Sequence, residues 1–123
     1  MRNWNDLAGE ITNWISDYAL ENGIRSLVVG VSGGVDSAVT STLSARTGIR
    51  TIVLNMPIHQ KKQQNDLSKK HISWLKDNFN NVEERIVNLS KTYDSFVETV
   101  SADEVSDLAL ANSRARLRMT ALY

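Results

Sequence analysis

The chain of 123 residues is long enough for one domain with a sizeable core, because a chain of this size buries about two thirds of its unfolded surface on folding. Its 14 Lys and Arg residues balance 14 Asp and Glu residues, so no net field attracts nucleic acid or an anionic membrane, and we expect neither as a partner. The chain has no cysteine, which excludes disulfides, thiolate zinc sites and cysteine nucleophiles, and its 2 histidines are too few for a histidine-rich metal site.

Targeting patterns are absent from the sequence. The N-terminal residues show no basic segment followed by an apolar core and a cleavage site, and no apolar run approaches the roughly 20 residues of a membrane span. We therefore expect a cytoplasmic protein in which residues 1–123 form a single domain.

The first predicted element is a helix that begins at Trp4. Asn3 is a suitable N-cap for this helix, and Gly23 is a suitable stop. Its apolar positions recur at helical spacing, at Leu7, Ala8, Ile11, Trp14, Ile15 and Tyr18. An amphipathic helix therefore opens the fold.

Two strands with a helix between them follow. The continuous apolar run over residues 27–31 predicts a strand that is covered on both faces in a parallel sheet. Residues 36–47 predict a helix, with Gly48 as its left-handed exit. Residues 51–56 predict a second strand, which ends at Pro57.

The rest of the chain continues this alternation. Residues 59–65 are polar and aperiodic and predict a loop. The helix after it carries the apolar-face residues Leu67, His71, Ile72, Trp74, Leu75 and Phe79. Residues 85–89 predict a third strand, residues 93–100 a short helix, and the capping-box pattern of residues 101–104 the start of the last helix. This order predicts an α/β fold with a parallel sheet, in which ligands bind at the carboxyl ends of the strands.

The segment from Ser32 to Ser37 indicates chemistry by itself. Gly33 and Gly34 let the backbone approach a ligand with its N–H groups outward, and the positive end of the following helix adds attraction for phosphate. Asp36 places a negative charge where phosphate should lie, which is consistent with Mg²⁺ bridging the carboxylate and the phosphates. The sequence therefore predicts a nucleoside triphosphate site with Asp36 as a metal ligand.

Other glycine motifs fit this segment less well. The spacing departs from the Walker loop and from the dinucleotide-binding pattern. Residues 30–34 do satisfy the Gly-x-Ser-x-Gly pattern of a nucleophile elbow, in which Ser32 attacks a carbonyl. The elbow needs a later acid and histidine, and it leaves Asp36 and Ser37 unexplained. The elbow and a purely structural glycine turn stay open as alternatives.

The last helix carries a second signal. Arg116 falls in the middle of an apolar stripe, whereas Arg114 and Arg118 point to the other side, where we expect them to be solvated. The stripe consists of Val105, Leu108, Ala109, Asn112, Arg116, Met119 and Tyr123. A buried guanidinium needs an anion, so Arg116 meets either a carboxylate of this chain, a ligand or a partner subunit. We expect Tyr123 and Tyr18 to be core aromatics.

Two motifs resemble a known family. The Ser-Gly-Gly-Val-Asp-Ser segment of residues 32–37 resembles the PP-loop of the ATP pyrophosphatases, a superfamily that includes NAD synthetase, GMP synthetase and tRNA-modifying ligases. Residues 112–123 are similar to the Asn-x-x-x-Arg-x-Arg-Met-x-x-x-Tyr helix of the NAD synthetases. The opening helix and the Met56-Pro57 pair also look like that family, so the resemblance covers essentially the whole chain.

The resemblance implies a fold and a set of site residues. The fold is a Rossmann-like parallel sheet with helices on both faces, of the adenine nucleotide alpha hydrolase-like type, and we expect it to be incomplete in this chain. Arg116 would contact deamido-NAD, with Tyr18 and Tyr123 as further candidates, and no nucleophilic side chain is needed. Asp36 would bind Mg²⁺. The ATP-binding residues would be Gly30, Val31, Ser32, Gly33, Gly34, Val35, Asp36 and Ser37.

The implied activity is that of a carbon–nitrogen ligase that makes NAD⁺. ATP transfers AMP to the nicotinate carboxylate of deamido-NAD with release of pyrophosphate, and ammonia then displaces AMP. Free ammonia is favoured over glutamine because the chain has no glutaminase domain or cysteine, unless a separate subunit delivers the ammonia. The family implies a homodimer. The alternatives are another PP-loop enzyme, such as GMP synthetase or a tRNA-modifying ligase, and a non-catalytic nucleotide-binding fragment.

The length of the chain departs from the family. NAD synthetases are considerably longer, so we expect this chain to be an N-terminal portion that is poorly active or inactive alone. Their second metal carboxylate would lie beyond Tyr123. The first strand is internal in the family's sheet, and here we expect it to have an exposed apolar edge.

Overall fold

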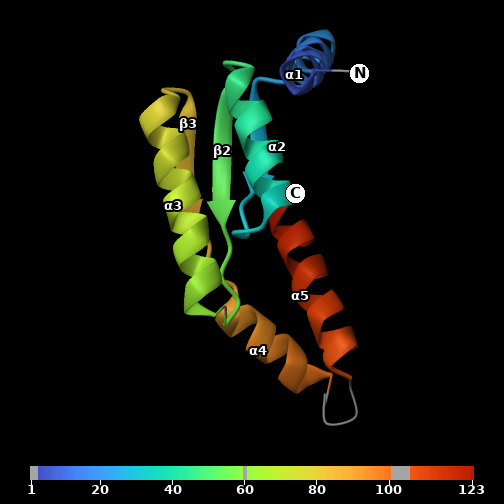
Figure 1. The fold of residues 1–123 in the computed structure, drawn as a ribbon. Helices are drawn as coiled ribbons and strands as arrows, with labels where there is room; N and C mark the ends of the chain where they lie inside the picture. The colour runs from blue at the N-terminus through green and yellow to red at the C-terminus, as the bar shows by residue number, and fades with distance from the viewer. Residues whose placement is uncertain (1–2, 60, 101–105) are drawn as a thin grey trace.

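Helices and strands alternate along the chain until two helices end it, and Figure 1 shows their arrangement. The computed structural model describes residues 3–59, 61–100 and 106–123. The elements in chain order are α1 (Trp4–Glu21), β1 (Ser26–Gly30), α2 (Val35–Arg46), β2 (Arg50–Asn55), α3 (Lys62–Asn78), β3 (Val82–Ile86), α4 (Ser90–Thr99) and α5 (Asp107–Leu122).

The three strands form a parallel sheet in the order β1-β2-β3, which confirms the predicted α/β class. Val28 of β1 lies opposite Ile52 of β2, and Thr51 of β2 lies opposite Val82 of β3. In the described residues β1 pairs only with β2, and Val28 is 46% exposed rather than covered on both faces. The expected exposed apolar edge of the first strand is therefore present.

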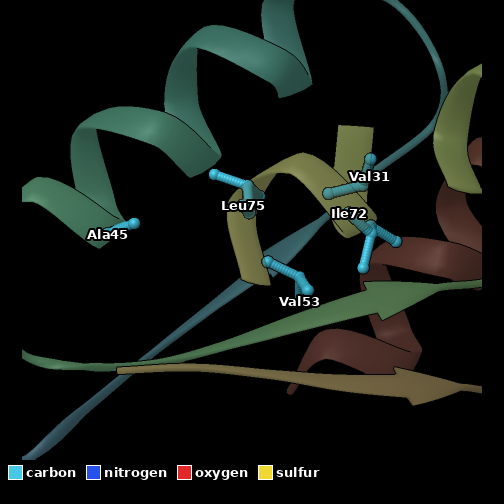
Figure 2. Packing of buried hydrophobic residues seen from close by; sticks show 5 residues of the cluster. All are labelled: Val31, Ala45, Val53, Ile72 and Leu75. Carbon is cyan, nitrogen blue, oxygen red and sulfur yellow. The ribbon is translucent and has the colours of Figure 1, made fainter. Parts of the chain in front are cut away.

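Helices cover both faces of the sheet. Successive side chains of β2 point to opposite faces, so neighbouring residues of this strand pack against different helices. On one face, Val53 packs with side chains of α2 and α3, as Figure 2 shows. That cluster consists of Val31, Ala45, Val53, Ile72 and Leu75. On the other face, Leu54 packs with α4 and α5 in a cluster of Leu54, Met56, Ile58, Leu89 and Tyr93, joined by Leu117 and Leu122.

The first two helices match the sequence closely. The Asn3 side chain accepts a hydrogen bond from the N–H of Asn5 at 2.8 Å and caps α1, as predicted. Gly23 and Gly48, the predicted stops of the first two helices, both have positive φ, at 66° and 80°. α1 packs against α2.

The predicted starts of α3, β3 and α4 are wrong, and α4 begins at Ser90 rather than at residue 93. α3 begins at Lys62, so residues 62–65, predicted as loop, form its first turn. This turn is polar and mostly exposed and carries no apolar period to reveal it. β3 spans Val82–Ile86 instead of residues 85–89, because its charged residues hide the strand pattern. Residues 87–89 still run beside β2 and Pro57, where the N–H of Leu89 donates to the carbonyl oxygen of Pro57 at 2.9 Å.

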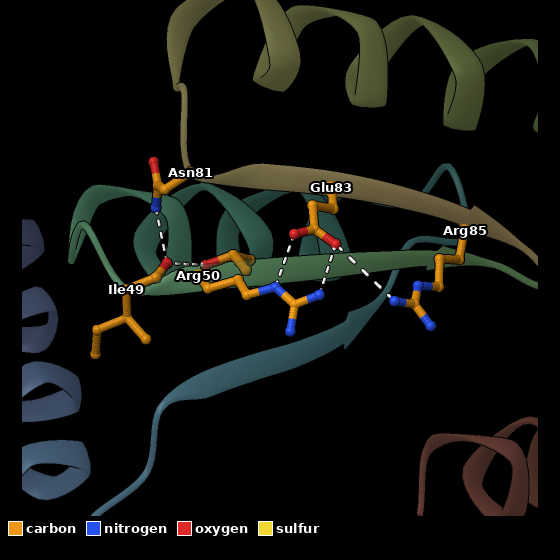
Figure 3. Close-up of polar contacts among 6 residues, drawn as sticks. Ile49, Arg50, Asn81, Glu83 and Arg85 are labelled. Atoms are coloured by element: carbon orange, nitrogen blue, oxygen red, sulfur yellow. Dashed lines mark hydrogen bonds and ion pairs between the residues drawn. The ribbon is translucent and has the colours of Figure 1, made fainter.

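Charged and polar contacts hold β3 in register. Arg50 donates from Nε and Nη2 to the Glu83 carboxylate, at 2.7 and 2.9 Å, across β2 and β3. Asn81 donates from Nδ2 to the carbonyl oxygens of Ala45 and Ile49, at 2.9 and 2.8 Å. Figure 3 shows Arg50, Glu83, Arg85 and the contact from Asn81 to Ile49.

In the described residues the last helix begins at Asp107. Its N-cap is Ser106, whose Oγ accepts a hydrogen bond from the N–H of Ala109 at 3.2 Å. The predicted capping box of residues 101–104, and Val105 of the stripe, lie outside the described residues. None of the helices in the described ranges has the length and apolar composition needed to cross a lipid bilayer.

Candidate nucleotide site

The segment between β1 and α2 lies at the carboxyl edge of the sheet, as predicted. β1 ends at Gly30, and the N–H of Val31 still donates to the carbonyl oxygen of Leu54 at 2.9 Å. The chain therefore leaves the sheet at Ser32. α2 begins directly after Gly34, which is its N-cap in an extended conformation.

Position 33 requires glycine because of its backbone conformation and because of the atoms next to it. Its φ of 91° lies in the region that favours glycine. A Cβ at this position would lie 2.7 Å from the carbonyl oxygen of Gln64 and 3.4 Å from the Cβ of Leu67. Both neighbours belong to α3, so the loop rests directly on the first turns of this helix.

The two serines of the loop hold it in shape. The N–H of Ser32 donates to Ser37 Oγ at 3.1 Å, and that hydroxyl donates to the carbonyl oxygen of Gly34 at 3.2 Å. The N–H of Gly34 donates to Ser32 Oγ at 3.3 Å. These bonds do not use the N–H groups in the first turn of α2, which have no intrahelical acceptor. The loop is therefore preformed, with N–H groups available to an anion.

Asp36 lies in the first turn of α2, and its side chain is exposed. Mg²⁺ in nucleotide sites is usually held by one or two carboxylates together with phosphate oxygens, so a single exposed carboxylate beside free amides fits this ion. The described residues contain no group of three or more His, Cys, Asp and Glu side chains that could hold a metal. A cation at Asp36 would therefore complete its coordination with other oxygen atoms, such as those of water or of bound phosphate.

Two hollows adjoin the loop at the carboxyl edge of the sheet. The smaller, of about 320 Å³, lies against Gly30 and Met56 on the α5 side. The larger, of about 800 Å³, lies between the loop, the start of α3, α4 and α5. Ser32 and Arg118 line both hollows, which therefore share a border. Polar and charged side chains of the larger hollow include His59, Lys61, Gln63, Gln64, Arg114 and Arg118.

Arg114 and Arg118 face these hollows, and the prediction that they are solvated is wrong. Both are half-buried. Arg118 donates from Nε to the carbonyl oxygen of Met56 at 3.0 Å, and Arg114 donates from Nη1 to the hydroxyl of Tyr93 at 3.2 Å. Burial lowers the pKa of Arg118, and the nearby charge of Arg114 lowers it further. The structure thus brings two guanidinium groups to the loop that sequence patterning placed on the outside.

Arg116 lies on the exposed side of α5, so the prediction that it is buried is wrong. α5 packs on the sheet through Leu117 and Leu122, whereas Leu108 and Met119 of the predicted stripe are 73% and 49% exposed. Arg116 makes no ion pair with any described residue. It borders a separate hollow of about 230 Å³ with Phe96, Ser113, Leu117 and Thr120.

Tyr18 and Tyr123 are also outside the core, contrary to prediction. Tyr18 is 51% exposed and stacks on Trp14 with ring centroids 5.5 Å apart, and Tyr123 is fully exposed. Neither tyrosine lines the hollows beside the loop. The structure therefore brings together the residues of the loop, but it places Arg116 and both tyrosines apart from it.

Neither histidine activates Ser32, so the geometry gives the nucleophile elbow no support. His59 Nε2 lies 2.7 Å from Asp94 Oδ1, and His71 Nε2 lies 2.8 Å from Ser41 Oγ. Within the described residues, the Ser32 hydroxyl contacts only groups of the loop itself. The Ser–His bond that an elbow requires is missing from this part of the chain.

Comparison with known proteins identifies the family. Residues 7–123 match the family model of NAD synthase. The chain is 32% identical to an NH₃-dependent NAD⁺ synthetase of Carboxydothermus hydrogenoformans, over 98% of this chain and 49% of that protein. It spans about half the length of the curated relatives that it matches.

Solved structures agree with this match. An NMN synthetase from Francisella tularensis has a TM-score of 0.88 and 27% identity, over 100% of this chain and 50% of that one. An NH₃-dependent NAD synthetase from Campylobacter jejuni has a TM-score of 0.83 and 25% identity, over 99% and 51%. Family model, relatives and fold agree, and the chain belongs to the NAD synthase family.

Proposed function

We propose that this chain serves ATP-dependent NAD⁺ synthesis, as a carbon–nitrogen ligase. ATP adenylates the nicotinate carboxylate of deamido-NAD and releases pyrophosphate, and ammonia then displaces AMP to give the amide. The observation that supports this most strongly is the preformed Ser32–Ser37 loop at the carboxyl edge of β1, in a chain that matches the NAD synthase family over residues 7–123.

In this proposal the loop binds the phosphates of ATP. Free amides in the first turn of α2 and the positive end of that helix suit an anion. The hydroxyls of Ser32 and Ser37 lie 3.3 Å apart and add polar contacts on the same edge. The close packing of Gly33 on Gln64 fixes the loop before the ligand arrives, so positioning costs little when it binds.

Asp36 is the proposed Mg²⁺ ligand. When bound there, Mg²⁺ supplies charge neutralisation for the phosphates. The position of Asp36 at the start of α2 places its carboxylate next to the proposed phosphate-binding amides. Gly34, the N-cap of α2 before Asp36, has a φ of −87°, which residues other than glycine also adopt.

The proposed deamido-NAD contacts are Arg116, Tyr18 and Tyr123. All are exposed, so they are accessible to a ligand or to a second copy of the chain. We infer a homodimer from the family resemblance. The exposed edge of β1 and the exposed apolar residues of α1, including Trp4 and Trp14, are surfaces on which a further chain could pack.

A second candidate substrate is nicotinate mononucleotide. The Francisella structure with a TM-score of 0.88 is an NMN synthetase. In this candidate the nicotinate carboxylate of the mononucleotide would be adenylated by ATP as proposed for deamido-NAD. The two substrates differ by an AMP unit, so they share the proposed ATP site and differ only in the site for the acceptor.

An assay with ATP, Mg²⁺ and ammonium, and with either deamido-NAD or nicotinate mononucleotide, tests the proposal through the release of AMP and the amide product. We expect the 123-residue chain alone to give little or no product. The same assay on a chimera, in which this chain replaces the matching half of the Carboxydothermus synthetase, should give AMP and NAD together. ATP binding without AMP release by a folded chimera would indicate a non-catalytic nucleotide-binding module.

A further inference from the structure

Arg118 is held in a fixed orientation at the border of the two hollows. Its Nε donates to the carbonyl oxygen of Met56 at 3.0 Å, at the end of β2. This bond leaves the terminal nitrogens of the guanidinium without a described acceptor. Because Arg118 and Ser32 line both hollows, the terminal nitrogens and the phosphate-binding loop share the same space.

The charge of Arg118 is not balanced by the described part of the chain. Among the described residues, no carboxylate forms an ion pair with Arg118 or with Arg114, which lies one turn earlier on α5. Arg114 instead lies against Tyr93, with its guanidinium carbon 5.7 Å from the ring centroid. A half-buried guanidinium beside a second one is costly unless an anion compensates both, and Arg remains protonated at neutral pH.

The hollows themselves have only basic charge. The described residues that line them include Lys61, Arg114 and Arg118 but neither Asp nor Glu. The Asp94 carboxylate pairs with one lining residue, His59, at 2.7 Å. In a chain of zero net charge, three cationic side chains around one polar hollow are a local anion-binding feature.

We propose that Arg118, with Arg114 beside it, is a second phosphate contact that binds the polyphosphate tail of the nucleotide from the side opposite the Ser32–Ser37 loop. The Met56 carbonyl acts as the positioning group, because it fixes Nε and turns the terminal nitrogens toward the ligand. This inference rests on the proposed function. It adds a contact from α5 at a residue that the apolar stripe predicted to be solvated.

Calorimetric titration of the 123-residue chain with magnesium pyrophosphate and with magnesium ATP tests the proposal. Arg118→Gln removes the charge but keeps a donor for the Met56 carbonyl. We expect this variant to bind both ligands about 10- to 100-fold more weakly, because a charge-assisted hydrogen bond is lost. Arg118→Lys keeps the charge and should restore part of the affinity. Arg25→Ala, at an exposed arginine before the amino end of β1, should bind as the unsubstituted chain does.

The outcomes separate this inference from the proposed function. If the unsubstituted chain binds and a folded Arg118→Gln variant binds equally well, the Arg118 contact is overturned and the loop site stands. If the unsubstituted chain binds neither pyrophosphate nor ATP, the Arg118 contact and the proposed loop site are both overturned. If Arg118→Gln changes the thermal unfolding midpoint, Arg114→Gln decides, because its bond reaches only the Tyr93 hydroxyl. Unchanged binding in that variant then overturns the proposal, and weakened binding supports it.

Discussion

A Cβ atom on Gly33 would lie 2.7 Å from the carbonyl oxygen of Gln64. This relationship joins the proposed phosphate-binding loop to α3, a helix that starts 25 or more residues later in the chain. The loop is therefore shaped by tertiary packing as well as by its own hydrogen bonds.

Gly33→Ala is expected to destabilise the chain, because alanine at φ 91° is strained and its Cβ would meet backbone that cannot rotate away. The strain alone costs about 1–2 kcal/mol. Chemical denaturation measures the free energy of unfolding. Gly34→Ala is the matched control: its Cβ would have Ser32 Oγ at 3.5 Å as nearest neighbour, and its cost should stay below about 1 kcal/mol. Equal costs for the two variants would contradict the packing argument.

Stability is expected to fall below neutral pH through His71. Partial burial lowers the pKa of this histidine, so protonation favours the unfolded chain, whose pKa is the ordinary one. The free energy of unfolding should therefore decrease as pH falls through about 6.5 and below. The free energy of unfolding is measured at pH 7.5 and at pH 5.5, about one unit either side of that value. Its decrease between these two pH values should be smaller in His71→Gln than in the unsubstituted chain. The same pH difference in both proteins would show that His71 does not titrate in this way.

Arg50 is expected to control the ionisation of Glu83. Its bidentate hydrogen bond is the main cause that lowers the pKa of Glu83, and the charge of Arg85 contributes less. Arg50→Ala should raise the Glu83 pKa toward its ordinary value, as followed by NMR titration of the carboxyl carbon. Arg85→Ala is the control, since its Nη2 lies 4.0 Å from the same carboxylate, and it should raise the pKa less. The reverse order would contradict the pairing.

Arg116→Ala should leave the fold intact and weaken the binding of the acceptor substrate. The side chain is exposed, so the free energy of unfolding should change by less than about 0.5 kcal/mol. If Arg116 contacts deamido-NAD, binding of that ligand should weaken far more than binding of ATP, which calorimetry or equilibrium dialysis can compare. A loss of stability with unchanged ligand binding would assign Arg116 a structural role.

The sequence predicts the strand–loop–helix arrangement around residues 32–37 well, because its signal is local. An apolar strand, two glycines and a helix start follow one another within residues 27–37, and the structure has this order. The caps at Asn3 and Gly48 are local signals of the same kind. Short-range backbone chemistry is thus sufficient to predict where the loop lies.

The orientation of α5 could not be predicted in this way. Apolar residues occur on several sides of this helix, so the stripe through Arg116 and the side through Leu117 compete for the sheet. Packing on Leu54 and Met56 favours the second side and turns Arg118 inward. The side of α5 that faces the sheet depends on long-range contacts, which the periodicity of the sequence does not contain. The position of β3 is also hard to predict, because its charged residues hide the strand pattern.

The central claim, that the Ser32–Ser37 loop and Asp36 bind ATP with Mg²⁺, is tested most directly by calorimetric titration of ATP with and without Mg²⁺. The unsubstituted chain is predicted to bind ATP more tightly with Mg²⁺. Asp36→Ala is predicted to lose this dependence, and Asp17→Ala, at an exposed carboxylate of α1, to keep it. Absence of ATP binding, or an Asp36→Ala variant with the full Mg²⁺ dependence, would contradict the account.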